Sequence, residues 1–220
     1  MAQKLKIVMA QLNFLVGDID GNTDRVIESA QRALEEHSAH LIAFPELTLT
    51  GYPPEDLLLR PSLQHRIEKA LRKIIDANLD IYLVVGHPFL KGSKLYNALS
   101  VIKGDKLLAT YFKQCLPNYQ VFDERRYFVP GTEPCVLNLL GTNCAFTICE
   151  DLWETEPIYQ AQKAGAQLLV NINASPFHVN KLTERKALLK ERALEGGFPI
   201  IYVNLVGGQD ELVFDGCSMA

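Results

Sequence analysis

An apolar run leads into a cysteine and two acidic residues in the segment Ala145-Phe146-Thr147-Ile148-Cys149-Glu150-Asp151-Leu152-Trp153. Its first four residues form an apolar run that predicts a buried strand, and the acidic residues after Cys149 indicate a turn out of the sheet. A cysteine at such a turn projects into a cleft where backbone N–H groups can stabilise an oxyanion. Because a free thiol is only a few per cent ionised at neutral pH, it needs a base or a cation nearby. From this local sequence alone, a catalytic thiol and a small buried core residue are equally good interpretations of Cys149.

Two more polar residues follow predicted strands. Glu46 comes after an apolar run, and Pro45 cannot continue a central ladder, so the carboxylate is expected at the rim of the sheet. Lys113 ends the run 107–112. Taken singly, each is more often a solvated charge. Near a thiol, however, the lysine becomes a cation that can stabilise a tetrahedral intermediate. We therefore expect Glu46, Lys113 and Cys149 to converge at one edge of a sheet.

Hydrophobic periodicity predicts strands intermixed with helices. Apolar runs predict strands at 5–10, 41–44, 81–85, 95–102, 106–111, 136–139, 143–148, 168–172 and 200–203. Asn22 and Ser62 are candidate caps of two amphipathic helices, and a third helix is predicted from Lys181 to Glu195. Hairpins are expected near Gly92 and Gly104. The fold class is therefore α/β, with a mixed sheet that carries helices.

Two long loops, 46–61 and 114–134, separate these elements. Structureless loops longer than about 12–15 residues are usually functional or disordered. These loops contain proline, tyrosine and phenylalanine, which favours ordered loops that build a site.

Composition narrows the class of protein. The 220 residues fit one domain, and the net charge of -4 argues against a nucleic-acid partner. No apolar run approaches the ~18 residues of a membrane span, and the N-terminus has no signal-peptide pattern. Five cysteines, an odd number without C-x-x-C spacing, indicate reduced thiols and a cytoplasmic location. We predict no metal site.

Several longer blocks carry a family resemblance. They are Phe44-Pro45-Glu46-Leu47-Thr48-Leu49-Thr50-Gly51-Tyr52-Pro53-Pro54-Glu55-Asp56-Leu57, Leu116-Pro117-Asn118-Tyr119 with Val121-Phe122-Asp123-Glu124, Ile148-Cys149-Glu150-Asp151-Leu152-Trp153, Asn171-Ile172-Asn173-Ala174-Ser175-Pro176-Phe177, and residues 202–216. Together with the Glu46–Lys113–Cys149 set, they resemble the carbon–nitrogen hydrolase (nitrilase) superfamily. Within it, they resemble the N-terminal glutaminase domain of bacterial glutamine-dependent NAD synthetases. The blocks span almost the whole chain in the family's order.

The resemblance implies an α-β-β-α sandwich that hydrolyses L-glutamine to glutamate and ammonia. It assigns Glu46 as general base, Lys113 as electrostatic stabiliser and Cys149 as the nucleophile that forms a thioester. Positions that match the family's glutamine pocket are Tyr119, Ser175 and Lys181, with Tyr52, Glu150 and Trp153 as weaker candidates, and Glu124 supports Lys113. For Tyr52 and Trp153 packing is an equal alternative, and for Lys181 the alternative is a surface charge at a helix start.

The resemblance also implies a neighbouring domain outside residues 1–220. Such enzymes continue into a synthetase domain with a Ser-Gly-Gly-x-Asp-Ser loop, which this sequence lacks. The expectation is a carbon–nitrogen hydrolase domain that is incomplete before its last strands, without the synthetase domain. No cofactor is expected in this chain, and ATP and Mg²⁺ are expected only for the synthetase domain. The implied partners are that domain and further copies in a homo-oligomer. Cys217 stands where the family usually has glycine.

Two rival functions remain open. The first is a free-standing amidase of the same superfamily acting on another small amide, which the absence of a synthetase half keeps possible. The second is an inactive fragment or a regulatory module, against which the intact Glu46–Lys113–Cys149 set argues.

Overall fold

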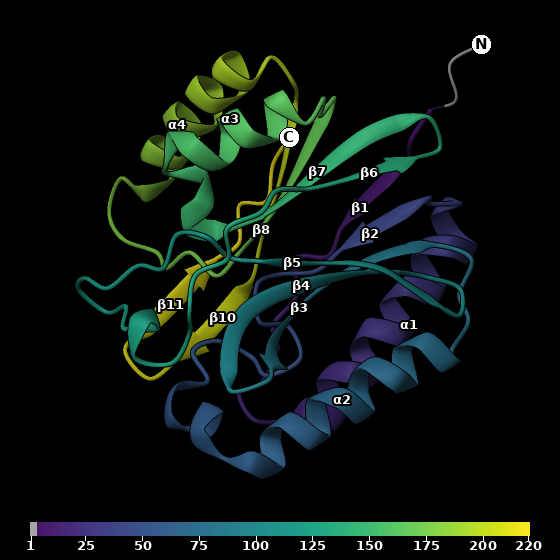
Figure 1. The fold of residues 1–220 in the computed structure, drawn as a ribbon, viewed down its shortest axis with the longest axis vertical. Helices are drawn as coiled ribbons and strands as arrows, with labels where there is room; N and C mark the ends of the chain where they lie inside the picture. Colours follow the sequence, from purple (N-terminus) through teal and green to yellow (C-terminus); the bar gives the residue numbers. More distant parts are fainter. Residues whose placement is uncertain (1–3) are drawn as a thin grey trace.

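Two β-sheets face each other in the computed structural model, which describes residues 4–220 (Figure 1). The five-stranded sheet has the order β1 (Ile7–Met9), β2 (Leu41–Ala43), β3 (Tyr82–Lys91), β4 (Lys94–Lys103) and β5 (Lys106–Phe112). The four-stranded sheet has the order β6 (Cys135–Leu139), β7 (Thr142–Ile148), β8 (Leu168–Asn173) and β9 (Ile200–Asn204). Both sheets are mixed: β1–β2–β3 and β7–β8–β9 pair in parallel, and β3–β4–β5 and β6–β7 pair antiparallel.

A pair of helices covers the outer face of each sheet. Helices α1 (Ile19–His37) and α2 (Pro61–Asp76) lie on the five-stranded sheet, and α3 (Thr155–Lys163) and α4 (Lys181–Gly196) lie on the other (Figure 1). Three apolar clusters fill the spaces between these layers. The middle cluster joins the two sheets and includes Leu41, Val84, Leu99, Phe146 and Val170. The predicted α-β-β-α sandwich is therefore confirmed.

Local sequence explains most element boundaries. The predicted hairpins are present, with Gly92 and Gly104 at positive φ in the turns between the antiparallel strands. Helix α4 ends at Gly196 and is capped by Gly197, whose φ of 70° is unfavourable for any residue with a Cβ. Two predicted caps are wrong. Asp18 caps α1, and Pro61 occupies the first position of α2 ahead of Ser62.

Asn22 lies inside α1 instead and is almost fully buried. Its side-chain amide donates to the carbonyls of Leu15 and Leu49, at 2.8 and 3.2 Å, and its oxygen accepts from the Leu15 N–H. An asparagine that pins a loop to a helix has the same sequence signature as a cap, which is why the prediction failed.

Three elements were not predicted: helix α3 and the two strands of a hairpin, β10 (Val206–Gln209) and β11 (Leu212–Asp215). After β11 the chain turns through Gly216 and Cys217, both at positive φ, and Met219 then pairs with Tyr202 of β9. The φ of 56° at Cys217 is in the left-handed region, which accounts for the glycine that the resemblance expects there.

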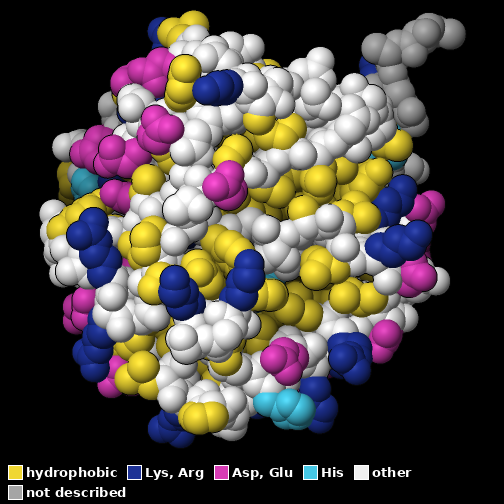
Figure 2. All heavy atoms as spheres, in the orientation of Figure 1, with side chains coloured by type: hydrophobic (Ala, Val, Ile, Leu, Met, Phe, Trp, Pro, Cys, Tyr) yellow, Lys and Arg dark blue, Asp and Glu magenta, His cyan; other side chains and the backbone are white. Residues whose placement is uncertain are grey.

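The face shown in Figure 2 carries hydrophobic side chains across its middle, where Figure 1 places β5 and β6. Among residues 4–220, no helix has the length and apolar character needed to cross a membrane.

Candidate active site

Glu46 follows Pro45 directly, in the loop that begins after the end of β2. Its side chain is 1% exposed. One carboxylate oxygen accepts from the Asn97 amide at 2.7 Å, and the other accepts from the backbone N–H of Ala174 at 3.0 Å. The close passage of this loop depends on Gly86 in β3, because a Cβ there would lie 2.6 Å from the Pro45 carbonyl oxygen. The carboxylate is thus held rigidly rather than solvated.

Lys113 follows the last residue of β5 and has a side chain that is 0% exposed. Its Nζ donates to Glu46 Oε1 and to Glu124 Oε1, each at 2.7 Å. Burial opposes the positive charge, but the Glu124 and Glu46 carboxylates outweigh it and hold the pKa of Lys113 well above its ordinary value. The residue is therefore a permanent cation, which is the state an electrostatic stabiliser needs.

Glu124 begins the short 3₁₀ helix η2 (Glu124–Arg126) and is also buried. Burial raises the pKa of its carboxyl to about 7, although Lys113 pulls the pKa down. The Asn97 amide also contacts Glu124, at 3.4 Å, and the Tyr52 hydroxyl does so at 3.5 Å. Lys113 therefore pairs with two carboxyl groups. Of these, Glu124 titrates near neutral pH.

Cys149 opens the 3₁₀ helix η3 (Cys149–Leu152) directly after β7, with φ at 44°. Its pKa lies well above the ordinary value of a thiol, chiefly because of burial and then because of the Glu46 charge, while Lys113 acts in the opposite direction. The resting thiol is therefore protonated. A protonated thiol needs a base before it can act as a nucleophile, and Glu46 is the carboxyl group whose charge acts on Cys149 most.

The three residues meet across two sheets, and the predicted single edge is wrong. Glu46 and Lys113 follow β2 and β5 of the five-stranded sheet, whereas Cys149 follows β7 of the four-stranded sheet. Periodicity identifies strand ends but not which strands pair, so the sequence could not separate these arrangements.

Tyr119 and Glu150 lie on the solvent side of the buried cluster. The Tyr119 hydroxyl donates to Glu150 Oε1 at 2.8 Å. Both line a cleft of about 850 Å³, together with Arg125, Glu154 and Glu156 and residues from the 114–130 segment. Glu150 follows Cys149 directly in the sequence, but the buried Cys149 is not itself among the residues that line this cleft.

Ser175 and Lys181 are placed by the second sheet and by α4. Ser175 is buried just past β8, and its hydroxyl accepts from Arg185 Nε at 3.2 Å. The Lys181 Nζ lies 4.1 Å from the centre of the Trp153 ring and 3.4 Å from a carboxylate oxygen of Glu184. Lys181 is thus tied to Trp153, at the C-terminal end of the turn that carries Cys149.

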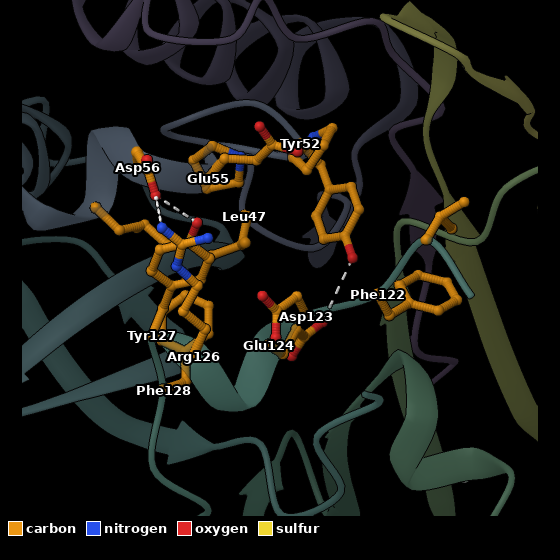
Figure 3. A pocket seen from close by; sticks show the side chains of 14 residues that line it. Leu47, Tyr52, Glu55, Asp56, Phe122, Asp123, Glu124, Arg126, Tyr127 and Phe128 are labelled. Atoms are coloured by element: carbon orange, nitrogen blue, oxygen red, sulfur yellow. Dashed lines mark hydrogen bonds and ion pairs between the residues drawn. The ribbon is translucent and has the colours of Figure 1, made fainter. Parts of the chain in front are cut away.

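Tyr52 and Glu124 both line a smaller pocket of about 190 Å³ (Figure 3). Figure 3 shows the Tyr52 hydroxyl pointing toward Glu124, and Asp56 binding Arg126 and the Tyr127 hydroxyl. The two long loops therefore contact each other around the buried cluster. That these loops build a site stays a prediction.

Sequence reasoning missed three buried polar residues around this cluster: Asn97, Asp151 and Arg185. The available signal was a polar residue inside an apolar pattern. Asn97 interrupts a buried strand, and Arg185 lies on the inward face of α4 with Leu188 and Leu189. Within residues 4–220, no group of three or more His, Cys, Asp or Glu side chains is arranged to hold a metal ion.

Comparison with known proteins places this geometry in a family. A "Glutamine-dependent NAD(+) synthetase" from Xanthomonas campestris pv. campestris is 50% identical over 99% of this chain, which spans 40% of that relative's length. A structure of the glutamine-dependent NAD+ synthetase from Acinetobacter baumannii superposes with a TM-score of 0.94 at 41% identity, over 97% of this chain and 40% of that one.

A second kind of relative is an amidase from Nesterenkonia sp. AN1, whose structure superposes with a TM-score of 0.86 at 28% identity over 98% of this chain and 84% of that one. In that structure acrylamide is added to the active-site cysteine. The carbon–nitrogen hydrolase family matches residues 6–220 of the present chain. The chain therefore belongs to the carbon–nitrogen hydrolase family.

Proposed function

We propose that this chain hydrolyses L-glutamine to glutamate and ammonia through a thioester on Cys149. The observation that carries the proposal is the buried set of one carboxylate, one permanent cation and one protonated thiol, contributed by Glu46, Lys113 and Cys149. A base, a cation and a thiol are the three groups that cysteine-based amide hydrolysis uses.

The proposed reaction begins when Cys149 Sγ attacks the carbonyl carbon of the side-chain amide and its proton passes to Glu46. Lys113 stabilises the negative charge that develops on the carbonyl oxygen. Glu46 then gives the proton to the leaving nitrogen, the C–N bond breaks, and ammonia leaves a glutamyl thioester. Water attacks the thioester after losing a proton to Glu46, the C–S bond breaks, and the sulfur recovers that proton. Atoms and charge balance over the cycle.

Selection of glutamine requires partners for its α-ammonium and its α-carboxylate. We assign Glu150 and the Tyr119 hydroxyl to the ammonium, since they already face each other in the cleft. Lys181 is assigned to the carboxylate, and its place against Trp153 fixes the direction of the cation. Ser175 and Tyr52 complete the proposed pocket, with Glu124 supporting Lys113.

The wider role is likewise a proposal. The relatives named as NAD synthetases are more than twice as long as the matched region, so we propose that the ammonia passes to a synthetase domain that uses ATP and Mg²⁺. We further propose a homo-oligomer, and a cytoplasmic location supported by five unpaired thiols.

A direct comparison of substrates tests the function. Release of ammonia would be measured with glutamine and with butyramide, which lacks both α-substituents, for the wild type and for Cys149→Ala. We expect hydrolysis of glutamine alone, and none by the variant. Equal hydrolysis of butyramide would favour a general amidase similar to the Nesterenkonia enzyme, and normal turnover by Cys149→Ala would refute the proposal.

A further inference from the structure

A fully buried carboxylate lies behind the cysteine and belongs to Asp151, in η3. Its two oxygens accept four hydrogen bonds, all from neutral donors. Oδ1 accepts from the backbone N–H groups of Gln114 and Cys115, at 2.9 and 2.7 Å. Oδ2 accepts from the backbone N–H of Ile148 at 2.9 Å and from the hydroxyl of Tyr111 at 2.8 Å.

The four donors flank the two residues that the reaction must align. Ile148 is the last residue of β7 and precedes Cys149. Tyr111 lies on β5 two positions before Lys113, and Gln114 follows Lys113 directly. Because β5 and β7 belong to opposite sheets, the Asp151 carboxylate joins the ends of two strands that do not pair with each other.

The turn that Asp151 closes is strained. Cys149 adopts a φ of 44°, in the left-handed region that is unfavourable for a residue with a Cβ. Such a conformation persists only where the surroundings hold it, and the bond from Ile148 N–H to Asp151 fixes the start of this turn. Burial raises the pKa of the Asp151 carboxyl to about 6, against the bonds from Ile148 and Cys115 that lower it. The ionised carboxyl group therefore lowers the stability of the fold at neutral pH, while its hydrogen bonds hold both strand ends.

We infer that Asp151 is a positioning residue, which fixes the Cys149 thiol relative to the Lys113 ammonium and thereby sets the rate of thiol attack without contacting the substrate. The turnover part of this inference rests on the proposed glutaminase function. The reactivity of the thiol toward a small alkylating agent does not depend on that function, so it provides an independent measure.

The test is Asp151→Asn in this protein. Asparagine has the same size, but its NH₂ group faces donors that the carboxylate accepted. Since a misplacement of about 1 Å can cost about 100-fold in rate, we expect kcat for glutamine to fall about 10- to 100-fold with KM changed less than about twofold. Alkylation of Cys149 by iodoacetamide should slow as well, with its pH profile displaced.

Two further variants keep the test decisive. Tyr111→Phe removes one of the four bonds and should give a smaller change of the same kind. Thr23→Val removes a buried hydroxyl bond to the Ile19 carbonyl in α1, away from the site, and controls for lost stability. Asp151→Asn with unchanged kcat and alkylation rate would overturn the inference, as would a rise in KM that accounts for the lost activity.

If Asp151→Asn does not fold, Tyr111→Phe decides, and wild-type kcat and alkylation in that variant would overturn the inference. If the wild type fails to hydrolyse glutamine, the proposed function falls, but the alkylation rates of the variants still confirm or refute the role of Asp151.

Discussion

Replacement of Lys113 by methionine removes the only cation that contacts the Glu46 and Glu124 side chains within residues 4–220. Methionine fills similar space without charge. At an effective dielectric constant of about 20, unit charges 2.7 Å apart attract by about 6 kcal/mol, and burial offsets much of this. Loss of one partner from a buried pair typically costs ~3–5 kcal/mol. Because Lys113 serves two carboxyl groups, we expect a loss near ~5 kcal/mol of unfolding free energy at pH 8.

The loss should depend on pH in a defined direction. Burial already raises the pKa of Glu124 to about 7 while Lys113 lowers it, so the pKa rises further when Lys113 is removed. The folded variant then holds more protons than the unfolded chain across the window from the ordinary pKa of 4.5 to beyond 7, and its stability falls as pH rises. The deficit relative to the wild type should therefore be larger at pH 8 than at pH 5.

Urea unfolding at these two pH values measures the deficit. Adding Glu124→Gln to Lys113→Met removes one unpaired carboxyl group and should restore part of the stability at pH 8. A deficit below ~1 kcal/mol, or one that is the same at both pH values, would refute the described network, because an unpaired buried carboxylate costs more than that.

Three further predictions concern single residues. Glu46→Gln should lower kcat for glutamine ~10²- to 10⁴-fold while KM stays near wild type in steady-state assays, since the amide cannot accept the thiol proton; unchanged kcat would exclude Glu46 as the base. Lys181→Ala should raise KM for glutamine far more than it lowers kcat, and an unchanged KM would remove Lys181 from the pocket. His87 is fully buried and burial lowers its pKa to about 4, so the unfolded chain binds the extra proton below its ordinary 6.5. His87→Gln should therefore abolish roughly 3 kcal/mol of stability loss between pH 6.5 and 4, as measured by urea unfolding. An equally acid-sensitive variant would contradict this.

The strands and the three central residues could be predicted because each depends on local pattern. Buried strands appear as short apolar runs, and Glu46, Lys113 and Cys149 each follow one of them. The sandwich and the proposed roles came from the family resemblance, since periodicity does not show how strands pair. The meeting of β2 and β5 with β7 across two sheets was therefore out of reach of pattern alone.

Other features depend on contacts between distant residues. Asn97 reaches Glu46 only because β4 and β5 place it beside Lys113, whose backbone N–H donates to the Asn97 carbonyl. Asp151 looked like part of an acidic turn, and only the fold shows its four donors. The β10–β11 hairpin contains Gly207 and Gly208, which lower β-propensity and hide the strand.

We propose Cys149 as the nucleophile toward a glutamine side chain. This role is tested by incubation with a glutamine analogue that carries an electrophilic carbon in place of the side-chain amide, followed by peptide mass spectrometry. We predict one label per chain, on the peptide that contains Cys149, with loss of ammonia release in proportion to labelling and protection by excess glutamine. Labelling of Cys115, Cys135, Cys144 or Cys217 in its place, or full turnover after complete labelling of Cys149, would contradict the account.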